Sequence, residues 1–210
     1  MKNNFGYKLL TPLMRVLFKL YYNPKIINKN VIPKSGSIII ACNHKHLFDQ
    51  CLTIMATKRP IHYMAKKEYF DGKLAWFFKF VGCIPVDRKR KDENAKSQAL
   101  NVLNSNGAIG IFPEGTRNRK KDKILLDFKY GAVSMAKKTN ALIIPCAVTG
   151  DYKIRSKNLI IRYGKPFKVN GDLSASNKHL FDEVSSLIDE NLKETNRSLM
   201  EEMNSHMEDK

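Results

Sequence analysis

The stretch Ser37-Ile-Ile-Ile-Ala-Cys-Asn-His-Lys-His-Leu-Phe-Asp49 decides the fold of this chain. Its continuous apolar run, Ile38 to Ala41, is typical of a strand buried on both faces of a sheet. We expect a turn after Asn43-His44 and a helix that starts near Leu47. Further strands are expected at 61–65, 82–88, 108–112, 141–148 and 159–163, with helices between them. The sequence therefore predicts an α/β fold with a mixed, largely parallel sheet flanked by helices.

His44 and Asp49 form the first candidate site. His44 stands at the predicted strand end, and the turn can fold Asp49 back to hydrogen-bond one imidazole nitrogen. The other nitrogen is then a proton acceptor at neutral pH, which makes a general base. The carboxylate would hold the tautomer and stabilise the imidazolium, as in a catalytic triad. A purely structural hydrogen bond between the two side chains is the alternative.

His44-x-His46 also suggests a metal site. Metallo-hydrolases of the lactamase type use His-x-His-x-Asp-His, but here Asp49 falls one position too late and Gln50 replaces the last histidine. No complete set of three or four ligands appears, so we expect no metal. The remaining histidines are isolated in the sequence: His62, His179 and His206.

Charge is strongly biased along the 210 residues. The formal net charge is +17, and residues 1–48 carry eight Lys or Arg and no acid. Such a field attracts lipid headgroups, phosphorylated metabolites, an acidic carrier protein or nucleic acid. The four cysteines form no Cys-x-x-Cys pair, which is typical of buried thiols in a reducing cytoplasm.

The N-terminal segment, residues 1–30, is predicted to be an amphipathic helix at a membrane interface. Thr11 can cap the helix with Pro12 in its first turn. Leu13, Leu17 and Phe18 supply apolar surface, and the charges exclude a transmembrane span. An ordinary core-packing helix is the alternative. Residues 31–210 are expected to form the α/β domain.

A second aromatic helix is expected at 74–81. Trp76, with Lys73 and Lys79 close by, fits the level of lipid headgroups. Burial within the protein would explain the same residues equally well.

Phe112-Pro-Glu-Gly-Thr-Arg117 is the second candidate site. Gly115 permits a tight turn with exposed N–H groups, Thr116 adds a hydroxyl, and Arg117 adds a planar donor fork suited to phosphate. Glu114 is expected to accept a hydrogen bond from a substrate hydroxyl or to orient Arg117. This turn therefore predicts an anion site at the carboxyl end of a strand. A solvated turn with an incidental ion pair is the alternative.

Three other cations could join this anion site. Arg88 ends a strand of its own and is the strongest of them, although it also belongs to the basic run Arg88-Lys-Arg-Lys91. Lys66 and Lys129 are weaker candidates, because each is explained as simply by a surface charge.

With these residues the chain resembles the glycerophospholipid acyltransferase family, most closely its bacterial 1-acylglycerol-3-phosphate acyltransferases. Four blocks appear in the family's order: Asn43-His44 with Asp49, Gly82 to Arg88, Phe112 to Arg117, and Ile143 to Val148. The resemblance implies that His44 is the base and Asp49 its partner. It also implies that Arg88 and the turn 114–117 surround a glycerol phosphate. His46 and Leu47 depart from the usual pattern.

The activity implied is 1-acyl-sn-glycerol-3-phosphate O-acyltransferase. It transfers an acyl group from a thioester of acyl carrier protein or coenzyme A to lysophosphatidic acid, giving phosphatidic acid. No bound cofactor is implied, and the enzyme would sit peripherally on an anionic membrane at its cytoplasmic face. Acylation of glycerol 3-phosphate or another lysophospholipid is the closest alternative. A nucleic-acid-binding module leaves the four blocks unexplained, so we expect no nucleic-acid partner.

Overall fold

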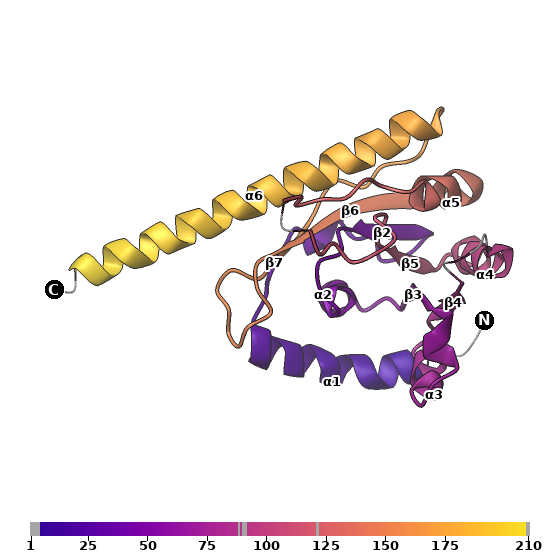
Figure 1. Ribbon diagram of the computed structural model, residues 1–210, viewed down its shortest axis with the longest axis horizontal. Coiled ribbons are helices and arrows are strands. Elements are labelled where there is room, and N and C mark those ends of the chain that lie inside the picture. Colours follow the sequence, from indigo (N-terminus) through magenta and orange to yellow (C-terminus); the bar gives the residue numbers. More distant parts are fainter. Residues whose placement is uncertain (1–4, 88, 90–91, 121, 209–210) are drawn as a thin grey trace.

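The computed structural model describes residues 5–87, 89, 92–120 and 122–208 (Figure 1). It contains one sheet and six α-helices within those residues, with short 3₁₀ turns at Lys29–Val31 and Lys67–Phe70. The strands are β1 Lys25–Ile27, β2 Ile38–Cys42, β3 Ile61–Lys66, β4 Ile84–Val86, β5 Ala108–Ile111, β6 Leu142–Thr149 and β7 Ile160–Tyr163. The helices are α1 Phe5–Tyr22, α2 Asp49–Ala56, α3 Ala75–Phe80, α4 Glu93–Asn104, α5 Gly131–Thr139 and α6 Leu173–Glu208.

The sheet has the strand order β1-β7-β6-β2-β5-β3-β4, with β2 at its centre. β6, β2, β5, β3 and β4 run parallel, whereas β7 runs antiparallel to β6 and β1 parallel to β7. The predicted mixed, largely parallel α/β sheet is confirmed. The boundary predicted at residue 30 falls after β1, so the sheet includes part of the predicted N-terminal segment.

Helices cover both faces of the sheet (Figure 1). Ile39 and Ala41 of β2 point into a core formed with α4, α5 and α6. Ile38 and Ile40 point into the opposite core, which includes Leu52 of α2. β2 is fully buried along its length, which explains its unbroken run of apolar residues.

Helix α1 lies on the outside of α2 and α3, and it begins earlier than expected. The cap predicted at Thr11 is wrong, because α1 already spans Phe5 and Pro12 lies inside it. Tyr7 Oη donates to the carbonyl of Arg59 at 3.1 Å, and Arg15 Nε donates to the carbonyl of Ile54 at 3.1 Å. These inward contacts fix which face of the helix is left outside.

Three of the four predicted membrane-interface residues are exposed. Leu13 is 59% exposed, Leu17 54% and Trp76 63%. The fourth, Phe18, is half-buried: its ring packs on Tyr22 and Phe48, with centroids 5.1 and 5.6 Å apart. The reason is helical periodicity, because Phe18 lies seven residues after buried Thr11 and therefore shares the inward face. Within the described residues, α1 and the other helices are too short or too polar to cross a bilayer.

Candidate active site

His44 is placed by the end of the central strand. Asn43 is almost fully buried, accepts a hydrogen bond from the Val148 N–H at 2.7 Å and donates to the Val148 carbonyl at 3.0 Å. This pair of bonds locks the end of β2 to β6. Because β2, β5 and β6 are parallel, their carboxyl ends meet at one edge, where open α/β sheets hold their ligands.

His44 and Asp49 come together as the sequence predicted. Asp49 Oδ2 lies 2.8 Å from His44 Nδ1 and also accepts the backbone N–H groups of Lys45 and His46, each at 2.8 Å. The Asp49 side chain is 0% exposed and stands in the first turn of α2. The His44 ring stacks on Phe112 at 3.9 Å between centroids. With Nδ1 engaged by the carboxylate, Nε2 is the nitrogen left to accept a proton.

Tyr152 completes this arrangement, and the sequence reasoning missed it. Its hydroxyl donates to Asp49 Oδ1 at 2.6 Å from the loop between β6 and β7. Burial raises the pKa of Tyr152 well above its usual range, and the Asp49 charge raises it further. No motif marks this tyrosine. Only the adjacency of β6 to β2 brings it to His44, and that adjacency is a property of the sheet.

Glu114 has a different task from the one expected. Its side chain is buried, with Oε1 accepting the His44 N–H at 2.6 Å and Oε2 accepting the Leu126 N–H at 2.9 Å. Burial raises the pKa of Glu114, although both backbone donors favour its ionised form. Glu114 therefore supports the backbone of His44 from inside the protein. The expectation that Glu114 contacts a substrate hydroxyl or orients Arg117 is wrong, because both of its oxygens accept backbone N–H groups.

The rest of the turn lies beside His44. The Asn118 N–H donates to the His44 carbonyl at 2.7 Å, so the residues after Glu114 wrap around the histidine. Gly115 has φ +72°, and a Cβ there would lie 2.9 Å from the Lys129 side chain. Thr116 is exposed and Arg117 is half-buried.

Arg117 and His46 lie at the same edge. Burial lowers the pKa of His46, Asp49 opposes this shift, and the positive charge of Arg117 lowers the pKa further. His46 packs within the turn and against the loop after β6. Its Nδ1 accepts the Phe48 N–H at 3.3 Å, and its ring stacks on Tyr152 at 4.1 Å.

Of the three other cations predicted to join the anion site, the structure places one beside the turn 114–117. The Lys129 side chain lies beside Gly115, and the backbone N–H of Lys129 donates to the Pro113 carbonyl at 2.8 Å. Lys66 ends β3, is exposed and is not among the described residues that line the cavity below. Arg88 lies outside the described residues.

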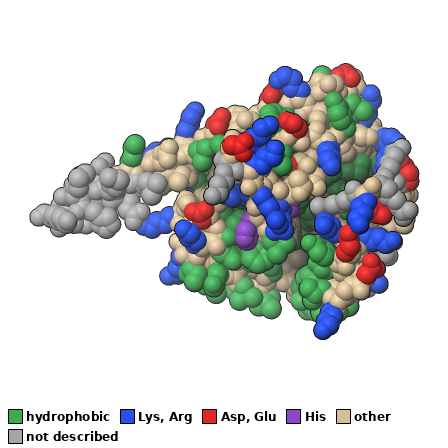
Figure 2. Space-filling model, viewed as in Figure 1, with side chains coloured by type: hydrophobic (Ala, Val, Ile, Leu, Met, Phe, Trp, Pro, Cys, Tyr) green, Lys and Arg blue, Asp and Glu red, His purple; other side chains and the backbone are tan. Residues whose placement is uncertain are grey.

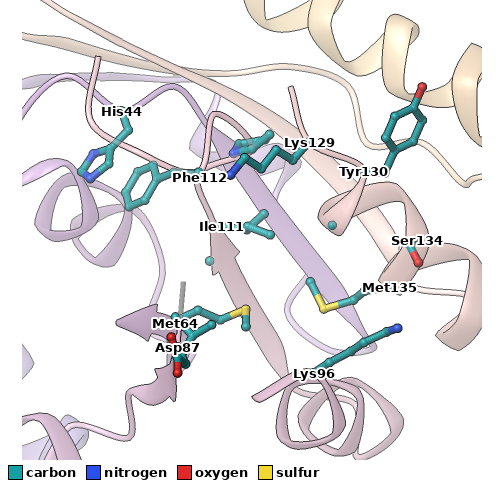
Figure 3. Close-up of a pocket in the computed structure, with 15 residues that line it drawn as sticks. His44, Met64, Asp87, Lys96, Ile111, Phe112, Lys129, Tyr130, Ser134 and Met135 are labelled. Carbon is teal, nitrogen blue, oxygen red and sulfur yellow. The ribbon is translucent and has the colours of Figure 1, made fainter. Parts of the chain in front are cut away.

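A cavity of about 450 Å³ opens beside His44 (Figure 3). His44 and Phe112 lie at one end, and Met64, Asp87 and Lys96 lie at the other. Met64, Val86, Ile111 and Met135 supply apolar lining. Its volume is in the range of sites that hold small molecules. A proton acceptor thus stands at the mouth of a space suited to a hydrocarbon.

Comparison with known proteins assigns this chain to a family. A model described as acyltransferase matches residues 23–149, which include His44, Asp49 and the turn 114–117. The chain belongs to the acyltransferase family. The family resemblance noted in the sequence is therefore confirmed.

Curated relatives of this acyltransferase carry a specific name. The 1-acyl-sn-glycerol-3-phosphate acyltransferase of Bacillus subtilis is 32% identical over 146 residues, covering 69% of this chain and 71% of the relative. The enzyme of the same name from Borreliella burgdorferi is 34% identical over 136 residues, covering 63% of this chain and 54% of the relative. The probable enzyme of Mycoplasma genitalium is 29% identical over 167 residues, covering 76% of this chain and 61% of the relative.

A solved structure shares the fold of this acyltransferase. The crystal structure of the 1-acyl-sn-glycerophosphate acyltransferase PlsC from Thermotoga maritima superposes with a TM-score of 0.71. The match covers 90% of this chain and 83% of that one at 19% identity. At this identity the likeness speaks for the fold alone.

Proposed function

We propose that this acyltransferase transfers a fatty acyl group from a thioester to the 2-hydroxyl of 1-acyl-sn-glycerol 3-phosphate, lysophosphatidic acid, giving phosphatidic acid. The observation that carries this proposal is the His44–Asp49 pair at the mouth of an apolar cavity. The names of the curated relatives supply the acceptor.

His44 acts as general base in the proposed reaction. Its Nε2 takes the proton of the acceptor hydroxyl as the oxygen attacks the thioester carbonyl, and Asp49 stabilises the imidazolium. The tetrahedral intermediate then collapses with cleavage of the C–S bond. His44 returns its proton to the departing thiolate, so the products are the ester and a free thiol. Every proton in this sequence is moved by His44, and the reaction as written needs no bound cofactor.

The two ends of the site would hold the two parts of the reactants. A hydrocarbon chain buried among Met64, Val86, Ile111 and Met135 gains about 0.8 kcal/mol per methylene. The acceptor phosphate would meet the turn at Gly115 and Thr116, with Arg117 as its fork-shaped partner. Holding both groups in register with His44 is itself a large part of catalysis.

Membrane attachment is proposed from the outer surfaces of α1 and α3. Figure 2 shows hydrophobic side chains gathered along this edge of the molecule with Lys and Arg beside them. The exposed residues include Leu9, Leu13, Val16, Leu17 and Leu20 on α1 and Trp76 on α3. An apolar surface with flanking cations suits an anionic bilayer. The protein would then be a peripheral enzyme of the cytoplasmic leaflet.

The acyl donor is proposed to be a thioester on a polyanionic carrier. The net charge of +17 favours either coenzyme A or an acidic acyl carrier protein. Both donors belong in the assay below, because the charge alone suits each of them.

An acylation panel tests the proposal. The purified full chain is given either donor and three acceptors: lysophosphatidic acid, glycerol 3-phosphate and uncharged monoacylglycerol. We expect phosphatidic acid as the main product and at least about a hundredfold lower kcat in His44→Ala with an unchanged unfolding midpoint. Arg117→Ala should raise the KM for lysophosphatidic acid more than that for the donor. Near-normal turnover in His44→Ala, or faster acylation of another acceptor, would contradict the assignment.

A further inference from the structure

The buried carboxylate of Asp49 is hydrogen-bonded on both of its oxygens. Oδ2 accepts three N–H groups, from the His44 ring and from the backbone of Lys45 and His46. Oδ1 accepts the hydroxyl of Tyr152 at 2.6 Å. A charge without contact to water needs such partners, so the donor to Oδ1 matters as much as those to Oδ2.

Tyr152 is itself held firmly. Its ring stacks on His46 with 22° between the planes and meets the edge of Tyr22 at 5.6 Å between centroids. The loop that carries it is tied down on both sides. Lys45 Nζ donates to the Gly150 carbonyl, and the Arg155 N–H donates to the Tyr21 carbonyl at 2.7 Å. The hydroxyl therefore reaches Asp49 from a fixed point.

This arrangement restricts the rotation of the carboxylate. Both oxygens turn together about the Cβ–Cγ bond, so a donor held on Oδ1 resists the same rotation as the three donors on Oδ2. The bond from Tyr152 therefore gives the carboxylate a second fixed point, and the plane of the carboxylate orients the His44 ring through Nδ1. The proton is kept on Nδ1, and Nε2 is kept ready to accept another.

We propose that Tyr152 is a positioning residue for acyl transfer. It acts through Asp49, by holding the carboxylate in the plane that keeps His44 in its base-competent tautomer. The proposal rests on the proposed function for its kinetic consequence, but its structural consequence is independent of any substrate.

The test compares the full chain with Tyr152→Phe, which removes only the hydroxyl. We expect kcat to fall about ten- to a hundredfold, as for loss of a hydrogen bond to a charged group. Both KM values should stay within about twofold, because Tyr152 touches the carboxylate and not the reactants. In ¹⁵N-histidine NMR, the distinct shifts of the two His44 nitrogens should converge as the tautomers mix. Signals of His44 are assigned by their loss in His44→Ala.

Tyr22→Phe is the matched control, because its ring packs on Tyr152 but its hydroxyl has no hydrogen-bond partner among the described residues. It should keep kcat within about twofold. Tyr152→Met provides a second variant without the hydroxyl and should behave as Tyr152→Phe. Unchanged kcat in the Tyr152 variants overturns the proposal, and so does a lower kcat with unchanged His44 shifts. If the wild-type protein transfers no acyl group, the proposed function fails while the NMR comparison still decides the role of Tyr152.

Discussion

His44 is held at its backbone as well as through its ring. Glu114 accepts its N–H, Asn118 donates to its carbonyl, and Asp49 and Phe112 fix the imidazole. Glu114 is 70 positions away in the chain, so the placement of the base depends on two strand ends meeting. A short motif around His44 is therefore insufficient by itself to build the site.

Glu114→Gln is expected to destabilise the fold. The amide oxygen can accept one of the two backbone N–H groups, but the amide nitrogen would face the other as a second donor. A buried donor without an acceptor costs about 1–3 kcal/mol. Urea unfolding measures the loss. Glu68→Gln, an exposed change, should stay within about 0.5 kcal/mol of wild type, and equal effects of both variants would contradict the role given to Glu114.

The same variant should reveal the titration of Glu114. A raised pKa means that the folded protein binds this proton more tightly than the unfolded chain does. Wild-type stability therefore falls as pH rises from the usual glutamate range through the raised pKa. Glu114→Gln has no such titration. The difference in free energy of unfolding between the wild type and this variant should therefore decrease as the pH rises.

The sequence predicted the His44–Asp49 pair because both residues belong to one turn, where spacing alone limits the geometry. Glu114 was found, but with the wrong partner, because a sequence does not show whether a carboxylate points inward. Tyr152 was missed, since 103 residues separate it from Asp49. To predict which distant side chains support the His44–Asp49 pair, one must know the order of the strands in the sheet, and the sequence did not reveal that order.

At the level of elements, long apolar runs were predicted well, whereas the short edge strand β1 was not predicted. β2 and β6 are central strands buried along most of their length, and this burial makes their sequences unmistakable. β1 has three residues, Lys25–Ile27, at the sheet edge and carries too few apolar positions to stand out. The sequence of β7 also gives no indication that this strand runs antiparallel to β6.

Gly110→Ala is expected to strain the centre of the sheet. A Cβ on this residue of β5 would lie 2.2 Å from the Tyr63 ring, which is itself buried on β3. Because ring and strand are both enclosed, the clash should cost about 1–3 kcal/mol in the free energy of unfolding. Gly72→Ala is the control, since its nearest neighbour would be 3.9 Å away. Equal stability of the two variants would show that Tyr63 can move aside.

At the level of the whole molecule, α1 combines a packed inner face with an exposed outer one. Gly6, Tyr7 and Thr11 are buried against the body, so removing the helix would also damage the fold. Single outward side chains are better probes of membrane attachment.

Leu13→Glu with Leu17→Glu is expected to weaken binding to anionic vesicles by at least about tenfold, because two apolar contacts are replaced by charges that anionic lipid repels. Vesicle co-sedimentation measures this change. Leu192→Glu places the same charge on α6, which lies across the sheet from α1 (Figure 1), and should have little effect. Unchanged vesicle binding in the double variant would remove the proposed membrane surface.

The cavity described beside His44 separates two tasks in space. The base stands at the end of the middle strand, where any shift would disturb the bonds to both neighbouring strands. The opposite wall comes from Met64, Lys96 and Met135, which take no part in those bonds. We therefore expect preference for longer or shorter fatty acids to change through exchanges at that wall alone, with turnover on the favoured chain preserved.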